Sequence, residues 1–339
     1  MTDAAEPTVL AEISGSVGRI VLNRPKALNA LDLPMIRQVG AALDRFRTDP
    51  AVRLVTIEGA GGRAFCAGGD VRAIRANTLA GDFAASEAFF AAEYAVNQAI
   101  AEFPKPYIAL IDGISMGGGM GLSIHGSHRV VSEHALMAMP ETTIALFPDI
   151  GASFFMPRLP DQIGVWAALV SARLGPGDCL AAGLATHFVP RAELPALADA
   201  LCREGIEALA QWHAKPAPET LDAATRAAIA RCFGQESVPS IVAALEAEGT
   251  DWAKRQLAAL RAASPTSLFV SLAVMRRGAA STLAQALETE LSLTRSVTRH
   301  PDFLEGVRAQ VVEKTRDPKW QPPTIEAVDP AAIARMFAG

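Results

Sequence analysis

The sequence predicts an α/β protein that continues into a helical C-terminal part. Short apolar runs alternate with helical patterns over the first half of the chain, which favours strands joined by right-handed crossovers. Strand signals fade after about residue 160, and prolines then divide an Ala-, Leu- and Arg-rich stretch into several helices. The 339 residues exceed the size of about 250–300 residues at which a single core stops growing. We therefore expect a core over residues 1–200 and a helical region over residues 201–339.

The first expected elements are a strand, a helix and a second strand. Residues 19–22 (RIVL) and 54–57 (LVTI) are short buried runs that end in turn residues, as strands do. Between them, residues 34–46 place apolar side chains at helical spacing, and Asp32 is a suitable N-terminal cap. The apolar positions of this helix are Ile36, Val39, Leu43 and Phe46.

The next expected elements repeat the alternation. Residues 86–102 have a helical pattern that Pro104 stops, and residues 107–111 (YIALI) form a third strand. A Gly-rich turn and a further helix follow directly, and residues 130–131 are a fourth, much shorter strand. The sequence contains no internal repeat of the kind that marks solenoids or propellers.

Composition narrows the class of protein. Hydrophobic residues make up 50% of the chain and charged residues 20%, which is typical of a folded globular protein. The net charge is −5 and no long basic run occurs, so we expect no nucleic-acid partner. We also expect no targeting segment, no membrane span and no metal site. Four scattered cysteines without metal spacing suggest reduced thiols and a cytoplasmic protein.

Two Gly-rich turns carry the first chemical signal. Phe65-Cys66-Ala67-Gly68-Gly69-Asp70 follows the strand at 54–57, and Gly117-Gly118-Gly119-Met120-Gly121 follows the strand at 107–111. The second turn lacks the GxGxxG pattern of a dinucleotide site and the Gly-Lys-Ser/Thr of a P-loop. Each turn alone is also explained by tight packing between a strand and a helix. Together, they could each direct one backbone N–H at the same carbonyl oxygen, which would form an oxyanion hole.

Glu141 and Asp149, eight residues apart, lie downstream of the second turn. A pair of carboxylates can provide acid, base or nucleophilic catalysis. For Asp149 the alternative is a helix cap ahead of Gly151.

Several segments resemble the crotonase (enoyl-CoA hydratase/isomerase) superfamily. They are NRPKALNAL at 23–31, RAFCAGGD at 63–70, KPYIALIDGISMGGGMGLS at 105–123 and MPETTIALFPDIG at 139–151. Within that superfamily the chain most resembles the 3-hydroxyisobutyryl-CoA hydrolases. The segments that indicate this group are FFAAEY at 89–94, LSIHGSHRV at 122–130, LFPDIGASFFMPRL at 146–159 and DFLEGVRA at 302–309.

The resemblance implies a crotonase-like spiral of ββα units with a helical C-terminal region. It also implies an acyl-CoA thioester as substrate, whose carbonyl is polarised by the N–H groups of Ala67 and Gly118. Lys26 and the segment Gly68, Gly69 and Asp70 match stretches that line the CoA moiety. The resemblance implies no cofactor, because coenzyme A is part of the substrate.

One position departs from the hydratases of the superfamily. They carry two glutamates, one matching Glu141 and the other matching Gly121, which has no titratable atom. The hydrolase group instead has an aspartate at the position of Asp149, and its Glu–Asp pair carries thioester hydrolysis. The residue that matches Glu93 is implicated in holding the substrate. The resemblance therefore implies hydrolysis of a short β-hydroxyacyl-CoA, with 3-hydroxyisobutyryl-CoA as the expected substrate and valine catabolism as the pathway.

Two other functions are open at this point. One glutamate can suffice to move a double bond, so Glu141 alone is compatible with an enoyl-CoA isomerase, and a hydratase is the related alternative. The other alternative is a non-catalytic acyl-CoA-binding protein, although such a binder gains little from carboxylates beside a thioester. Relatives commonly form trimers, so a homo-oligomer is expected without a fixed stoichiometry.

Overall fold

The computed structural model describes residues 6–212 and 219–338, and the chain divides into two compact units. The two units interleave along the sequence, and the boundary between them falls within a helix and at the end of a strand. The expected division at residue 200 stays a prediction. Unit 1 contains Met1–Gly69, Ala95–Met137 and Leu174–Thr220, and unit 2 contains Asp70–Tyr94, Ala138–Arg173 and Leu221–Gly339.

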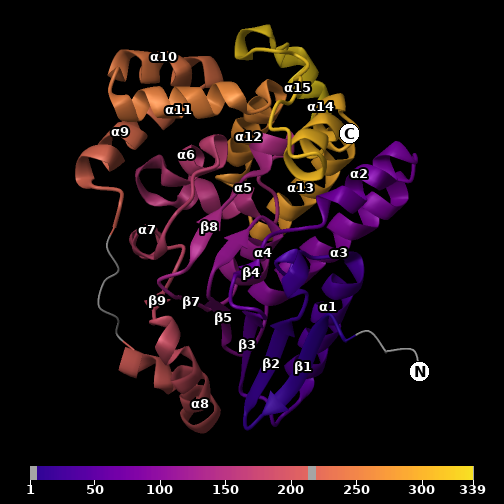
Figure 1. The fold of residues 1–339 in the computed structure, drawn as a ribbon, viewed down its shortest axis with the longest axis vertical. Helices are drawn as coiled ribbons and strands as arrows, with labels where there is room; N and C mark the ends of the chain where they lie inside the picture. Colours follow the sequence, from indigo (N-terminus) through magenta and orange to yellow (C-terminus); the bar gives the residue numbers. More distant parts are fainter. Residues whose placement is uncertain (1–5, 213–218, 339) are drawn as a thin grey trace. The chain divides into compact units, whose positions relative to one another are not determined.

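Unit 1 is built on a sheet with the strand order β1-β2-β3-β5-β7-β9 (Figure 1). The first two strands are antiparallel, and each later strand pairs with its neighbour in parallel. The expected strands at 19–22, 54–57, 107–111 and 130–131 are all present. The strands are β1 (Val9–Ser14), β2 (Val17–Leu22), β3 (Leu54–Gly59), β5 (Tyr107–Ile111), β7 (His128–Val131) and β9 (His187–Phe188).

A second sheet has the order β4-β6-β8 and gives the fold its repeated ββα character. Each of its strands directly follows a strand of the larger sheet, and β4 and β6 are each followed by a helix. The α/β class and the ββα repeat are confirmed. The sequence did not predict these strands, since three residues are too few to show a period of two. They are β4 (Ala64–Cys66), β6 (Ile114–Met116) and β8 (Leu136–Ala138).

Two helices cover opposite faces of the larger sheet in unit 1. Helix α1 (Leu33–Thr48) begins at Asp32, whose side chain accepts a hydrogen bond from the Met35 N–H at 2.9 Å, as predicted. Its Phe46 ring packs so closely on Gly18 that a Cβ there would lie 2.7 Å from it. The next residue back along β2, Val17, packs in the cluster that holds helix α8 (Leu194–Glu204). Adjacent strand residues point to opposite faces, so α1 and α8 lie on different sides.

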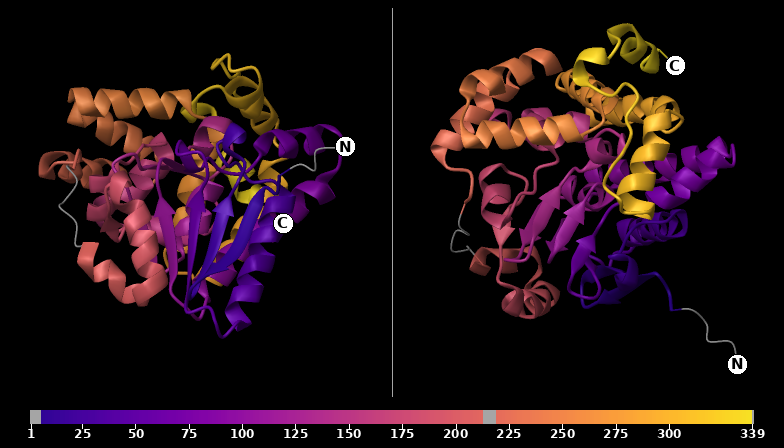
Figure 2. Two further views of the ribbon diagram at one scale, coloured as in Figure 1. Left: turned by 60° about the horizontal axis from the view of Figure 1, so that its bottom comes forward. Right: turned by 45° about the horizontal axis from the view of Figure 1, so that its top comes forward.

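Unit 2 is mainly helical, and this confirms the expected helical C-terminal part. Helices α10 and α11 lie side by side in all three views (Figures 1 and 2). The helices of this unit are α2 (Val71–Leu79), α5 (Ala152–Phe155), α6 (Ile163–Val170), α9 (Ala223–Phe233), α10 (Val238–Glu248), α11 (Asp251–Ala262), α12 (Pro265–Gly278), α13 (Leu283–Val297), α14 (Pro301–Val307) and α15 (Pro330–Met336). The unit boundary falls within α3 (Phe83–Ala101), and unit 1 also contains α4 (Gly118–Ile124) and α7 (Pro176–Ala181).

Within the described ranges, no single helix is long and apolar enough to cross a membrane. Only α11 and α12 taken together pass by length and composition, and they are bent by 106° at their junction.

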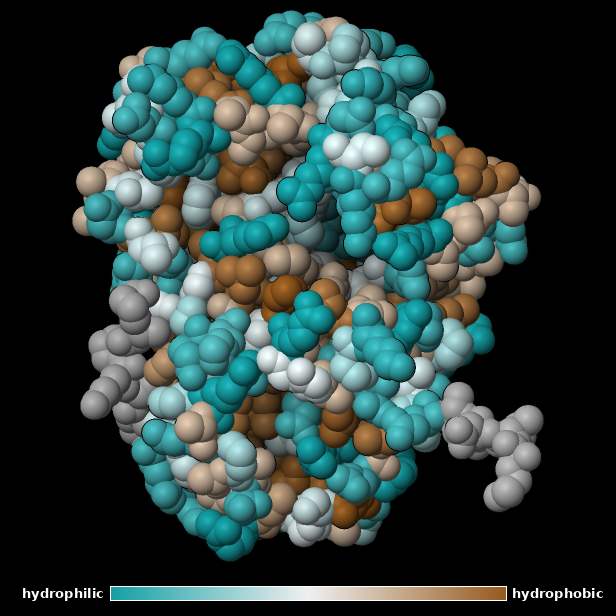
Figure 3. Space-filling view, in the orientation of Figure 1, coloured by the Kyte–Doolittle hydropathy of each residue, from teal (hydrophilic) through white to brown (hydrophobic). Residues whose placement is uncertain are grey.

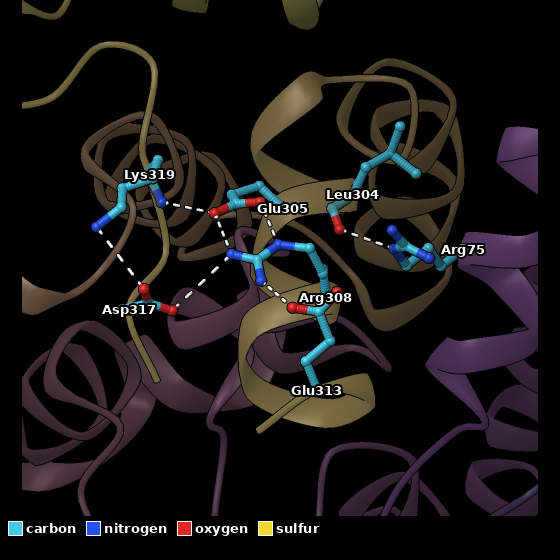
Figure 4. A network of polar contacts seen from close by, with 7 residues as sticks. All are labelled: Arg75, Leu304, Glu305, Arg308, Glu313, Asp317 and Lys319. Carbon is cyan, nitrogen blue, oxygen red and sulfur yellow. Dashed lines mark hydrogen bonds and ion pairs between the residues drawn. The ribbon is translucent and has the colours of Figure 1, made fainter. Parts of the chain in front are cut away.

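An ion-pair network in unit 2 ties together the segment that follows α14 (Figure 4). The Arg308 guanidinium donates to both carboxylate oxygens of Glu305 at 2.8 Å and also to Glu313. The hydrogen bond from Arg308 holds the pKa of Glu305 down at about 2. The Lys319 N–H donates to the same carboxylate at 2.8 Å, so Glu305 links α14 to a segment fourteen residues further along the chain. Exposed pairs of this kind each add little stability, so the network mainly orders the segment.

Candidate active site

In unit 1 the two Gly-rich turns meet because the strands that precede them are neighbours. Strand β4 pairs in parallel with β6, so both strands end at the same edge of the small sheet. Ala67 follows β4 directly, and Gly117 follows β6 and leads into α4. The carboxyl ends of parallel strands are the usual place for a ligand to bind.

Contacts between the two turns explain why they are rich in glycine. A Cβ on Gly119 would lie 2.2 Å from the carbonyl oxygen of Cys66, which is backbone and cannot turn aside. Gly68 has φ +106°, and a Cβ there would lie 3.2 Å from the Met116 carbonyl oxygen and 3.8 Å from the Gly118 nitrogen. Only glycine is accommodated at such close backbone approaches. The tight-packing explanation of the glycines is therefore correct. The same close packing also brings the two predicted donors near each other.

The two predicted oxyanion donors differ in their hydrogen bonding. Gly118 is the first residue of α4, and the N–H groups of a helix's first turn have no acceptor within their own helix. The Ala67 N–H instead donates to the carbonyl oxygen of Leu28 at 3.0 Å. Leu28 has φ +53°, and the buried side chain of the next residue, Asn29, holds its loop by accepting from the Arg24 N–H at 2.9 Å.

The residues predicted to line CoA lie on the segments around these turns. Lys26 is exposed within the short helix η1 (Pro25–Ala27), two residues before Leu28. Gly69 forms a bridge with Leu31, so the segments that contain Lys26 and Gly69 run side by side in unit 1. Asp70 lies in unit 2 as the residue that precedes α2, and its carbonyl accepts from the Ala73 N–H at 3.0 Å.

In unit 2 the structure gathers the three predicted carboxylates in the interior. Glu93 comes from α3, Glu141 begins the short helix η2 (Glu141–Ile144), and Asp149 lies in the loop before α5. Their exposed fractions are only 3%, 5% and 4%. Oε1 of Glu93 and Oε2 of Glu141 have no hydrogen-bond partner within the described ranges. Buried carboxylate oxygens without a partner are costly, which makes these two atoms candidates for contact with a bound molecule.

Burial and mutual repulsion raise the pKa values of these groups. Burial raises the pKa of Asp149 to about 6, although its hydrogen bond from Tyr94 opposes the change. Burial, followed by the charge of Asp149, raises the pKa of Glu93 and of Glu141 well above the usual range. A carboxyl whose pKa is moved towards neutrality can both accept and release a proton, as acid–base catalysis requires.

The structure adds two residues that the sequence did not single out for the site. The Tyr94 hydroxyl donates to Oδ2 of Asp149 at 2.8 Å, and Glu290 of α13 binds the turn that follows Asp149. Tyr94 stands beside Glu93 in the FFAAEY segment, so its position in the sequence was a usable signal. The sequence also contains a signal for Glu290, because this residue falls on the buried face of α13. The apolar residues of that face are Ala286, Leu287, Leu293 and Val297.

Replacing Tyr94 by Phe should move the acidic limb of the kcat/KM profile to higher pH. The Tyr94 hydrogen bond favours the ionised form of Asp149, so its loss raises a pKa that is already about 6. If Asp149 acts as an anion, activity is then lost earlier as the pH falls. The pH dependence of kcat/KM for the wild type and Tyr94→Phe measures this shift. An unchanged acidic limb would mean that Asp149 does not control it.

A groove lies elsewhere in unit 1, and none of the predicted site residues lines it. It has a volume of about 520 Å³ between α8 and the first strands of the larger sheet. Figure 3 shows a mixture of hydrophilic and hydrophobic residues over this part of the molecule. Both arginines that line it are already paired, Arg19 with Glu12 and Glu58, and Arg191 with Asp112. Among the residues that the structure describes, no group of three His, Cys, Asp or Glu side chains could hold a metal ion.

Comparison with known proteins agrees with the geometry. The family model described as "Enoyl-CoA hydratase/isomerase" matches residues 17–337. The chain is 43% identical to the mitochondrial 3-hydroxyisobutyryl-CoA hydrolase of Xenopus tropicalis, over 96% of this chain and 87% of the frog protein. Two solved structures superpose closely. A carnitinyl-CoA dehydratase from Mycobacterium thermoresistibile has a TM-score of 0.93 and 37% identity, covering 98% of this chain and 96% of its own. An enoyl-CoA hydratase from Rhodobacter sphaeroides has a TM-score of 0.91 and 41% identity, covering 98% and 97%.

The chain therefore belongs to the enoyl-CoA hydratase/isomerase family, as the resemblance implied. The same comparison corrects one expectation. Scattered cysteines suggested a cytoplasmic protein without a targeting segment, but the vertebrate relatives are named as mitochondrial enzymes. Reduced cysteines do not separate these compartments, so the cytoplasmic prediction was wrong.

Proposed function

We propose that this chain hydrolyses a short β-hydroxyacyl-CoA thioester, converting 3-hydroxyisobutyryl-CoA into 3-hydroxyisobutyrate and free CoA. One observation carries the proposal. Two acidic residues, Glu141 and Asp149, are buried together in unit 2, whereas Gly121 in α4 supplies no carboxylate at the position where the hydratases have one. The hydrolase names of the vertebrate relatives support the same reaction, and the substrate would place the chain in valine catabolism.

Backbone donors would stabilise the transition state. As the thioester carbon becomes tetrahedral, negative charge moves onto its oxygen, and the N–H groups of Gly118 and Ala67 would bind that oxygen. The Gly118 N–H stands at the N-terminus of α4, where the helix contributes a partial positive charge. The Ala67 N–H would exchange its bond to the Leu28 carbonyl for one to the thioester oxygen.

Glu141 would supply the nucleophile or the base. In one route its carboxylate attacks the carbonyl carbon, the C–S bond breaks, CoA leaves as a thiolate that takes up a proton, and water opens the mixed anhydride. In the other route Glu141 removes a proton from a water molecule that attacks the same carbon directly. The unpartnered Oε2 of Glu141 is available for either role.

The remaining predicted residues would hold the substrate. Asp149 would bind the β-hydroxyl or pass a proton to the leaving thiolate, and Glu93 would help to hold the acyl group through its unpartnered Oε1. Lys26, Gly68, Gly69 and Asp70 would contact the CoA moiety. The reaction needs no separate cofactor, and a homo-oligomer stays the expected assembly.

The hydratase alternative has one observation in its favour, because the two superposed structures are named as a hydratase and a dehydratase. The deciding experiment uses the purified wild type with two substrates. Thiol release from 3-hydroxyisobutyryl-CoA is measured beside hydration of crotonyl-CoA at the enoyl absorbance. We expect fast thiol release and little hydration. Hydration without thiol release would replace the proposal by the hydratase alternative, and binding without either reaction would favour a non-catalytic acyl-CoA-binding protein.

A further inference from the structure

Glu290 is a carboxylate that the proposed reaction does not use, and it is fully buried. It comes from the middle of α13, and its exposed fraction is 0%. A buried carboxylate is expensive unless donors surround it. Three donors do so here: the Gly151 N–H at 2.7 Å to Oε2, and the Ser153 N–H at 2.9 Å and Ser153 hydroxyl at 2.5 Å to Oε1.

All three donors belong to the turn that directly follows Asp149. This turn contains two consecutive left-handed residues, Ile150 with φ +57° and Gly151 with φ +80°. A positive φ is rare for a β-branched residue and persists only where the surroundings enforce it. The Asp149 carbonyl accepts from the Ala152 N–H at 2.9 Å, which closes the turn from its other side.

Asp149 is therefore fixed at two points. Tyr94 binds its carboxylate, and Glu290 holds the backbone that follows it. The charges of Asp149 and Glu290 also sense each other, since Asp149 is one cause of a Glu290 pKa raised to about 8, after burial as the largest cause. The segment that contains Glu290 lies about 140 residues further along the chain, in the helical C-terminal part.

We infer that Glu290 is a positioning residue, which holds the left-handed turn at Ile150 and Gly151 and thereby orients Asp149 towards the β-hydroxyl of the substrate. This inference rests on the proposed function for its consequence in catalysis. The structural part, namely that Glu290 restrains the turn, is independent of the proposed function. The two parts are tested by different measurements.

The main variant is Glu290→Gln, which keeps the size of the side chain. One of its terminal atoms becomes an NH₂ group, which cannot accept from the Gly151 or Ser153 N–H, so only one of the two backbone bonds can survive. Ser153→Ala removes only the hydroxyl bond to Glu290 and is the milder variant if Glu290→Gln fails to fold. Thr294→Val is the matched control, because Thr294 is a buried polar residue one turn further along α13 whose hydroxyl donates to the Leu291 carbonyl oxygen of its own helix.

We expect kcat for 3-hydroxyisobutyryl-CoA to fall about 10- to 100-fold in Glu290→Gln with KM changed less than about threefold, since small misplacements of a reacting group have effects of this size. Ser153→Ala should lose less, and Thr294→Val should resemble the wild type. The preference for 3-hydroxyisobutyryl-CoA over isobutyryl-CoA should fall most in Glu290→Gln, less in Ser153→Ala and not in Thr294→Val. A merely structural role would lower kcat equally for both substrates. That result, or an unchanged kcat in folded Glu290→Gln, would overturn the inference.

Amide hydrogen exchange at residues 150–155 tests the turn itself without any substrate. Exchange should be at least about tenfold faster in Glu290→Gln than in the wild type, and unchanged in Thr294→Val. If the wild type released no CoA, the proposed function would fail, but this comparison would still decide whether Glu290 restrains the turn. Equal exchange in all variants would show that it does not.

Discussion

Replacing Glu141 by Gln is expected to lower kcat about a thousandfold while KM changes less than about threefold, which is the range seen when a catalytic acid or base is removed. The amide has nearly the shape of the carboxylate, but it can neither attack the thioester carbon nor take a proton from water. Steady-state thiol release from 3-hydroxyisobutyryl-CoA measures the effect.

Thermal unfolding of Glu141→Gln provides the control for this loss. Burial disfavours the charged form of Glu141, and its Oε2 has no hydrogen-bond partner among the described residues that the substitution would break. The variant should therefore be at least as stable as the wild type, since a neutral amide costs less to bury than a carboxylate. Near-normal kcat in a stable variant would remove Glu141 from the catalytic machinery.

Replacing Asp149 by Ala is expected to reduce kcat/KM for 3-hydroxyisobutyryl-CoA about 10- to 100-fold more than for isobutyryl-CoA, which lacks the hydroxyl. A hydrogen bond to a charged group contributes about 1.5–3 kcal/mol, and each 1.4 kcal/mol corresponds to a factor of ten. Parallel measurements of kcat/KM on the two thioesters give the ratio directly. Equal losses on both would exclude hydroxyl binding and leave proton transfer to the thiolate as the role of Asp149.

The sequence predicted several parts of the fold that have a local pattern. Helix α1 with its Asp32 cap and strands β2, β3, β5 and β7 each carry their own apolar spacing or capping signal. Strands β4, β6 and β8 were missed because three residues show no period, and their pairing depends on contacts distant in sequence. The position of the two Gly-rich turns at one edge of that small sheet also depends on this pairing, so a local sequence pattern does not predict it.

The candidate site was predictable where chemistry follows a motif. The Gly-rich turns, Glu141 and Asp149 stand in segments that resemble a known family, and the structure places the three predicted carboxylates together within unit 2. Glu290 was not predicted because its partners lie about 140 residues away, and a glutamate in a helix is usually solvated. The bond between the Ala67 N–H and the Leu28 carbonyl was also not foreseen, because it depends on the path of a loop with left-handed residues.

The most direct test of the account is the position of isotope in the product when the wild type acts on 3-hydroxyisobutyryl-CoA in ¹⁸O-labelled heavy water. Attack at the thioester carbon predicts one ¹⁸O in the carboxylate of 3-hydroxyisobutyrate, free CoA in equal amount, and no deuterium at the α-carbon. Reversible dehydration, the chemistry of a hydratase, would instead place ¹⁸O at the β-hydroxyl and deuterium at the α-carbon. That second pattern would contradict the assignment of hydrolysis to Glu141 and Asp149 and would require another group to serve in place of the carboxylate absent at Gly121.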